Sequence, residues 1–201
     1  MIDTIPSPTL ATQLRNAVAM LFALTLLTGV AYPLAITAAA RLVFPRASSG
    51  SLVMKDGAVV GSRLLGQPFE APRYFWGRLS ATAPSPYNAQ ASGASNLGPT
   101  NHALTDSAKA RIEALRAADP GNDAPLPVDL VTSSGSGLDP HISLAAAAYQ
   151  VPRVARARQL GEERVRELVR ANVDDRDLLV LGEPGVNVLA LNLALDRERA
   201  R

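Results

Sequence analysis

The sequence has 201 residues, a formal net charge of +2, one tryptophan and no cysteine. This composition argues against nucleic-acid binding, which relies on basic surfaces and aromatic stacking platforms. It also excludes disulfides and thiolate metal sites, and His102 and His141 have no companion at metal-ligand spacing, so we expect no metal.

Residues 16–40 form an apolar stretch of 25 residues without a formal charge, bounded by Arg15 and Arg41. A helix of this length spans about 37 Å, which is enough to cross a hydrocarbon core of about 30 Å. The sequence therefore predicts a short N-terminal segment over 1–15, irregular over 1–14, and a transmembrane helix over 16–42. A buried core helix and a cleaved signal peptide are the alternatives, but the run is too uniformly apolar for the first and too long for the second.

Two features within this stretch predict its local structure. Pro33 removes one backbone hydrogen bond and should perturb the helix. Gly29 and the small residues Ala31, Ala35 and Ala38 offer a face on which another membrane helix could pack closely.

Residues 45–201 are long enough for one soluble domain with its own core. Two short apolar runs flank Asp56-Gly57 and predict a β-hairpin over 52–61. The stretch 67–100 is rich in proline and has no helical or strand period. It carries Tyr74, Phe75, Trp76 and Tyr87, so we expect a packed functional loop.

The rest of the chain predicts a mixture of helices and short strands. A helix should begin after an N-cap at Thr105, and another after a cap at Asp139. Pro152 should end the latter helix. The predicted helices cover 106–118, 141–150, 151–160 and 161–171; the predicted strands cover 128–131 and 186–195; and the charged tail 196–201 is expected to fray. The expected fold class is α+β: one N-terminal transmembrane helix followed by a single loop-rich mixed α/β soluble domain.

The stretch 132–141, TSSGSGLDPH, is the most site-like in the chain. A strand, a glycine-hydroxyl loop and a helix start in succession would present backbone N–H groups to a phosphate or carboxylate. The pattern is neither a Walker A loop nor a dinucleotide fingerprint, and a tight turn that needs glycine is an equal alternative. The candidate residues are Ser133, Ser134, Gly135, Ser136, Gly137, Asp139 and His141.

Ser136, Asp139 and His141 are the residue types of a nucleophile triad, but the G-x-S-x-G elbow is absent. We assign no catalytic residue. A membrane-anchored hydrolase and a stand-alone nucleotide-binding module remain as alternatives. An accessory subunit fits a single span and a loop-rich domain better.

Several segments resemble the C subunit of the Kdp potassium-transporting P-type ATPase. The resemblance covers most of the chain after the apolar stretch, with Leu79 where the family usually has proline and Ala94 where it usually has glycine. It rests on GSRLLGQPF (61–69), YFWGRLSA (74–81), YN (87–88), SGASNLGPTN (92–101), PVDLVTSSGSGLDPHIS (127–143), QVPRVARAR (150–158) and GVNVLALNLAL (185–195).

The resemblance implies three partners: a channel-like potassium-binding subunit, an ATP-hydrolysing P-type subunit and a very small single-span subunit. The Asp-Lys-Thr-Gly motif that P-type pumps phosphorylate is absent here, so this chain is not the catalytic subunit. The resemblance also implies either a catalytic chaperone that raises the ATP affinity of the pump subunit or a cap on the channel-like subunit. No firmly bound cofactor is expected, and ATP enters only through the pump subunit.

The resemblance further implies a single-pass protein of the cell (inner) membrane, in contact with the lipid bilayer, with its N-terminus in the cytoplasm and its soluble domain outside. The second stretch expected to make subunit contacts or organise the domain comprises Ser92, Gly93, Ser95, Asn96, Gly98 and Asn101.

Overall fold

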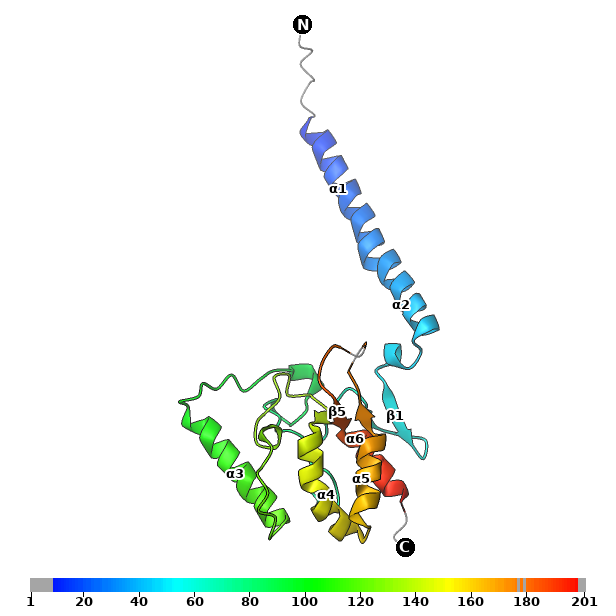
Figure 1. The fold of residues 1–201 in the computed structure, drawn as a ribbon. Coiled ribbons are helices and arrows are strands. Elements are labelled where there is room, and N and C mark those ends of the chain that lie inside the picture. Colours follow the sequence, from blue (N-terminus) through cyan, green and yellow to red (C-terminus); the bar gives the residue numbers. More distant parts are fainter. Residues whose placement is uncertain (1–8, 177, 179, 199–201) are drawn as a thin grey trace. The chain divides into compact units, whose positions relative to one another are not determined.

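A computed structural model describes residues 9–198 apart from 177 and 179 (Figure 1). The chain divides into two compact units, one that ends at Ser51 and one that begins at Leu52. The first is built around a long helix, and the second mixes helices with two small sheets. The expected combination of one long apolar N-terminal helix and a mixed helix-and-strand domain is confirmed.

The long helix of the first unit comprises α1 (Leu10–Leu26), the π-turn η1 (Leu27–Ala31) and α2 (Tyr32–Val43). Among the described residues, this 34-residue element is the one helix long and apolar enough to cross a membrane. It begins before the predicted start at Asn16 because the Thr9 hydroxyl accepts a hydrogen bond from the backbone N–H of Thr12. The irregular lead-in expected over 1–14 is therefore wrong for residues 10–14, and residues 1–8 lie outside the described part.

The perturbation expected at Pro33 takes the form of η1. Proline has no N–H and its ring crowds the carbonyl four residues earlier, here that of Gly29. The π-turn η1 contains Gly29 and is wider than an α-helical turn. Within η1, Thr28 Oγ1 donates at 2.7 Å to the carbonyl of Leu24, which lies one turn earlier in α1. After α2, a short 3-10 turn, η2 (Ala47–Ser49), ends at Gly50.

Within its described residues the second unit contains eleven elements, with β1 and β2 in one antiparallel sheet and the order β3-β5-β4 in the other. They are β1 (Leu52–Lys55), β2 (Ala58–Ser62), η3 (Ala89–Ala91), α3 (His102–Ala118), η4 (Val128–Leu130), β3 (His141–Ile142), α4 (Leu144–Arg158), α5 (Glu162–Ala171), β4 (Val173–Asp174), β5 (Gly185–Asn187) and α6 (Val188–Arg197).

The predicted hairpin is confirmed as β1 and β2. Its two turn residues, Asp56 and Gly57, have φ values of +51° and +80°. Positive φ at both central residues is what a tight hairpin turn of this type requires, and Asp-Gly tolerates it. The predicted helix over 161–171 is also confirmed, as α5.

The predicted helix caps at Thr105 and Asp139 are wrong. Helix α3 begins four residues earlier than expected because Asn101 Oδ1 accepts from Ala103 N, and Thr105 lies inside the helix. Residues 141–142 form β3, and Ser143 Oγ caps α4 instead. Both new cap residues have an extended backbone, Asn101 after a tight turn and Ser143 after β3.

The predicted helix end at Pro152 is also wrong, because α4 continues through it to Arg158. A proline in a helix interior costs about 3 kcal/mol. The neighbouring side chains Val151, Arg153 and Val154 are at most 3% exposed, and their packing offsets that cost.

Both predicted strands are wrong in type or length. Residues 128–130 form the 3-10 turn η4, and β5 (Gly185–Asn187) includes only the first two residues of the predicted strand 186–195. Asn187 Oδ1 accepts from Ala190 N and starts α6, whose buried Val188, Leu191 and Leu195 have helical spacing. Residues 196 and 197 belong to α6 instead of fraying, and residues 199–201 lie outside the described part.

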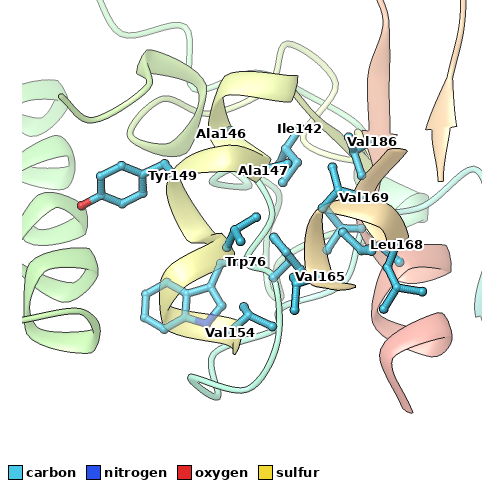
Figure 2. Packing of buried hydrophobic residues seen from close by; sticks show 14 of the residues in the cluster. Trp76, Ile142, Ala146, Ala147, Tyr149, Val154, Val165, Leu168, Val169 and Val186 are labelled. Carbon is cyan, nitrogen blue, oxygen red and sulfur yellow. The ribbon is translucent and has the colours of Figure 1, made fainter. Parts of the chain in front are cut away.

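The core of the second unit lies where α4 and α5 pack beside the three-stranded sheet. Figure 2 shows Val154 of α4 and Val165 of α5 gathered with Ile142 of β3 and Val186 of β5. Phe75 and Trp76 from the irregular stretch complete it, at 0% and 6% exposure. The expectation that this stretch is packed is therefore confirmed.

Candidate functional site

The structure brings the two predicted loops into contact. The backbone N–H of Gly93 donates to the carbonyl of Ser136 at 2.9 Å, and Ser92 Oγ donates to the same carbonyl at 3.1 Å. Ser133 Oγ and Ser95 Oγ lie 3.5 Å apart. The loops 92–101 and 133–141, which we call the paired loops, are thus joined along their first halves.

The two glycines of the second loop have different roles. Gly137 has φ +68°, and a Cβ there would lie 2.6 Å from Thr82 Cγ2 and 2.8 Å from the Gly93 carbonyl. Gly135 has open space around it. Only Gly137 therefore needs to be glycine for both its backbone conformation and its close contact.

A third segment, residues 78–88, supports the paired loops, and sequence reasoning did not assign it to the site. Ser80 Oγ donates to the Gly137 carbonyl at 2.7 Å and accepts from Tyr87 N at 2.9 Å. The Tyr87 hydroxyl donates to the Arg78 carbonyl at 2.5 Å, and burial raises the pKa of that phenol. The signal that could have indicated these residues is their presence in the recognised segments 74–81 and 87–88.

The loop 133–141 does not have the surroundings expected of an anion cradle. It follows the 3-10 turn η4 and runs into β3, so the predicted succession of strand, loop and helix start does not form. Three of its backbone N–H groups donate within the protein: Ser134 N to the Leu79 carbonyl, Gly137 N to the Ser134 carbonyl and Leu138 N to Ser136 Oγ. This geometry favours the tight-turn alternative.

Charged residues line the far end of the loop. Asp139 Oδ1 accepts from His141 N at 2.9 Å, and Asp139 Oδ2 accepts from Arg78 Nη1 at 3.1 Å. Partial burial raises the pKa of Asp139, but its hydrogen bonds from His141 and Arg78 outweigh burial and hold that pKa below its ordinary value. His141 Nε2 lies 2.9 Å from Asp174 Oδ2, and Asp174 in turn pairs with Arg63 at 3.1 Å.

These contacts do not build a nucleophile triad. Both ring nitrogens of His141 face carboxylates, Asp174 at 2.9 Å and Asp139 at 3.6 Å, and Ser136 Oγ accepts from Leu138 N. A base for a serine nucleophile needs one ring nitrogen directed at the hydroxyl. Within residues 9–198 as described, no group of three or more His, Cys, Asp or Glu side chains could hold a metal ion.

The remaining residues of the first loop shape the chain between η3 and α3. Asn96 is exposed with φ +51°, which suits asparagine, and the carbonyl of Gly98 accepts from Asn101 N at 3.0 Å. Asn101 caps α3. These three residues do not contact the loop 133–141 through any hydrogen bond that the structure records in the described residues.

A family model described as "K+-transporting ATPase, c chain" matches residues 14–197. A protein from Sorangium cellulosum is 64% identical over 187 residues, which are 93% of this chain and 98% of that protein. Proteins from Polaromonas naphthalenivorans (63% over 183 residues; 91% of this chain and 93% of that protein) and Methylococcus capsulatus (61% over 185 residues; 92% and 97%) are similarly close. All three carry the name potassium-transporting ATPase KdpC subunit.

Proposed function

The chain belongs to the KdpC family, the c chains of K+-transporting ATPases, and from this membership we propose that its second unit supports assembly of the Kdp complex through the paired loops. As a member, it is an accessory subunit of a multi-subunit potassium-transporting ATPase and not the catalytic one. It is associated with the membrane and has one candidate N-terminal apolar helix.

One observation carries the proposal: the paired loops form one surface. The Ser136 carbonyl binds both Ser92 and Gly93, and Gly137 fits closely against Gly93 and Thr82. Three segments far apart in sequence, 78–88, 92–101 and 133–141, are thus held together without a helix or a long strand. A surface fixed in this way is suited to present a defined shape to a partner at little ordering cost.

The proposed partners are the channel-like potassium-binding subunit, the ATP-hydrolysing P-type subunit and the small single-span subunit. We place α1 to α2 across the cell (inner) membrane, with the N-terminus in the cytoplasm and the second unit outside. In that orientation the second unit does not meet cytoplasmic ATP. No cofactor is then bound firmly by this chain, and ATP enters the cycle only through the P-type subunit.

A catalytic chaperone that raises the ATP affinity of the P-type subunit is the competing role. It requires the second unit to be cytoplasmic if nucleotide is contacted directly. The loop 133–141 uses several of its N–H groups for hydrogen bonds within the protein, which favours the assembly role over direct contact with nucleotide. Both ring nitrogens of His141 face carboxylates and not a serine, which argues against a hydrolase. The same internal hydrogen bonds disfavour a stand-alone nucleotide-binding module.

The assembly role is tested by the matched pair Gly137→Ala and Gly135→Ala. Each chain is co-expressed with the other Kdp subunits, one of which carries an affinity tag, and the recovered complex and potassium uptake are measured. We expect Gly137→Ala to reduce both several-fold and Gly135→Ala to leave both unchanged. Full recovery and uptake with Gly137→Ala would contradict the proposed role of the paired loops.

The orientation is tested with a single reporter cysteine, because the chain has none of its own. Ala110 is exposed in the middle of α3 and belongs to neither of the paired loops, so Ala110→Cys is a suitable position. We expect a membrane-impermeant maleimide to label it in intact cells. Labelling only after lysis would reverse the orientation and favour the chaperone role.

A further inference from the structure

We propose that His141 is a proton-operated clasp that ties β3 to β4 across the central strand β5 of the three-stranded sheet. The clasp goes beyond the proposed function, since it concerns how this chain responds to pH by itself. It comprises the imidazole of His141, the two carboxylates of Asp139 and Asp174, and the gap that Gly185 leaves between them.

The register of the sheet shows that the imidazole crosses a strand. His141 of β3 pairs with Asn187 of β5, whereas Asp174 of β4 pairs with Gly185 of β5. Strands β3 and β4 lie on opposite sides of β5, and the two pairs are two residues apart along it. His141 Nε2 nevertheless reaches Asp174 Oδ2 at 2.9 Å, so the side chain passes over β5.

Gly185 leaves room for this crossing. A Cβ at position 185 would lie 3.2 Å from His141 Cβ and 3.5 Å from both Cγ and Cδ2 of the ring. The two 3.5 Å distances are ordinary van der Waals contacts, but the 3.2 Å distance is tight, so a methyl group at position 185 would crowd the base of the His141 side chain and shift it slightly. Gly185 is not in the positive-φ region, so its role is to provide space and not an unusual backbone conformation.

Protonation changes what the imidazole can do in this position. The imidazolium donates from both nitrogens, to Asp174 from Nε2 and toward Asp139 Oδ1, 3.6 Å from Nδ1. The neutral ring donates from only one, and its other nitrogen then presents a lone pair to a carboxylate. The proton therefore turns an attachment to one carboxylate into a bridge between two.

The surrounding charges favour the protonated ring. Arg78 pairs with Asp139 and Arg63 pairs with Asp174, and these two guanidinium charges offset part of the attraction between the carboxylates and the imidazolium. His141, Asp139 and Asp174 also line a hollow of about 630 Å³ together with two more carboxylates, Asp175 and Glu183, and Glu183 pairs with Arg176. The nearby Asp139 carboxylate raises the pKa of His141 most, burial opposes it, and the hydrogen bond to Asp174 raises it further, so the net shift is upward.

The direction of the pH response follows from that upward shift. A histidine whose folded-state pKa lies above its unfolded value of about 6.5 contributes its full stabilisation below pH 6.5. The contribution is lost as the pH rises through the folded-state pKa. Because β3 directly follows the loop 133–141, release of the clasp also loosens the C-terminal end of the paired loops.

The test is a histidine NMR titration of the full chain in detergent micelles. The chain has only two histidines, so labelled imidazoles give two signals, and the His141→Gln variant assigns them. We expect His141 to titrate above 6.5 in the unaltered chain. Asp174→Asn and Gly185→Ala should each lower that pKa. The matched glycine control is Gly135→Ala, which should leave the pKa unchanged because a Cβ at position 135 meets only open space.

Two results would overturn the proposal: a His141 pKa at or below 6.5 in the unaltered chain, or an unchanged pKa in Gly185→Ala. A second measurement covers the case in which Gly185→Ala folds poorly. The melting temperature of the unaltered chain should fall between about pH 6 and about pH 9 by more than that of His141→Gln. Equal falls in both chains would contradict the clasp. Neither measurement involves the other Kdp subunits, so failure of the clasp leaves the assembly role open.

Discussion

The side-chain amide of Asn192 in α6 pairs with both backbone polar groups of Phe75, accepting from its N–H at 2.9 Å and donating to its carbonyl at 3.0 Å. Gln150 of α4 does the same for Trp76, at 2.8 Å and 3.1 Å. Both amides are 1% exposed. Two helices thus satisfy a buried, irregular backbone in the way that a neighbouring strand would.

The first prediction concerns Asn192→Leu, which keeps the branching of the side chain at Cγ and removes both hydrogen bonds. It leaves two buried backbone groups of Phe75 without partners, which costs about 2–5 kcal/mol of the free energy of unfolding. Denaturant unfolding of the full chain in detergent checks this. Gln90→Leu, at an exposed position in η3, is the control and should shift the free energy by less than about 0.5 kcal/mol. Equal effects of the two variants would contradict the prediction.

The second prediction is a coupling between Gly77 and Tyr87. A Cβ at position 77 would lie 2.8 Å from the Tyr87 hydroxyl, whereas the ring carbon Cζ is 3.9 Å away. Gly77→Ala should therefore destabilise the chain by about 1–3 kcal/mol. In a Tyr87→Phe background the hydroxyl is gone, and we expect the same substitution to cost much less. A double-mutant cycle from thermal unfolding measures the coupling, and additive effects would disprove it.

The third prediction concerns Arg153, whose guanidinium lies 4.8 Å from the Trp76 ring centroid and is 3% exposed. It donates to the Pro72 carbonyl at 2.5 Å and to Gln150 Oε1 at 2.6 Å, and burial lowers its pKa to about 10. Lysine lacks the planar fork needed for both acceptors, so Arg153→Lys should cost about 2–4 kcal/mol.

Fluorescence of Trp76, the sole tryptophan, reports this unfolding directly. The control is Arg166→Lys, on the exposed side of α5, where the arginine pairs with Glu162 at 2.5 Å. Such exposed pairs contribute about 0–1 kcal/mol. A loss at Arg153 no larger than the loss at Arg166 would refute the prediction.

The fourth prediction is a loss of stability in acid that depends on Asp196. Partial burial raises the pKa of Asp196, but the hydrogen bonds from Arg158 and Tyr74 and the charge of Lys55 outweigh it and hold the pKa below its ordinary value. Stability from such a carboxylate is present above its unfolded pKa and is lost as the pH falls through the folded one. The gap in melting temperature between the unaltered chain and Asp196→Asn should therefore shrink from about pH 6 to about pH 3. A constant gap would show that the ionised form does not contribute.

Features with local causes could be predicted from the sequence. Asp56-Gly57 accepts positive φ by its own chemistry, and α5 has acidic residues in its first turn and an arginine in its last. The long helix needs only an uninterrupted apolar run. In each case the neighbouring residues alone determine the structure.

Features that depend on distant partners were missed or misassigned. Asp139 has the composition and spacing of a helix cap, but Arg78, 61 residues earlier, binds its carboxylate, and Ser143 caps α4. The loop 133–141 was found as a site candidate, whereas Asp174 and Arg63, which complete its charge network, carry no local signal. The pairing of the two loops likewise depends on single hydrogen bonds between residues that lie 38 to 44 positions apart.

The π-turn η1 changes how the apolar helix must be divided into faces. A single residue advances an α-helix by about 100°, so the extra residue in a π-turn puts α1 and α2 out of phase by about that amount. Ala35 and Ala38 of α2 therefore do not extend a stripe that runs along α1, and Gly29 lies at the boundary between the two phases. One span thus presents two differently directed faces, and two neighbouring helices could each pack on one half of it without competing for the same side chains.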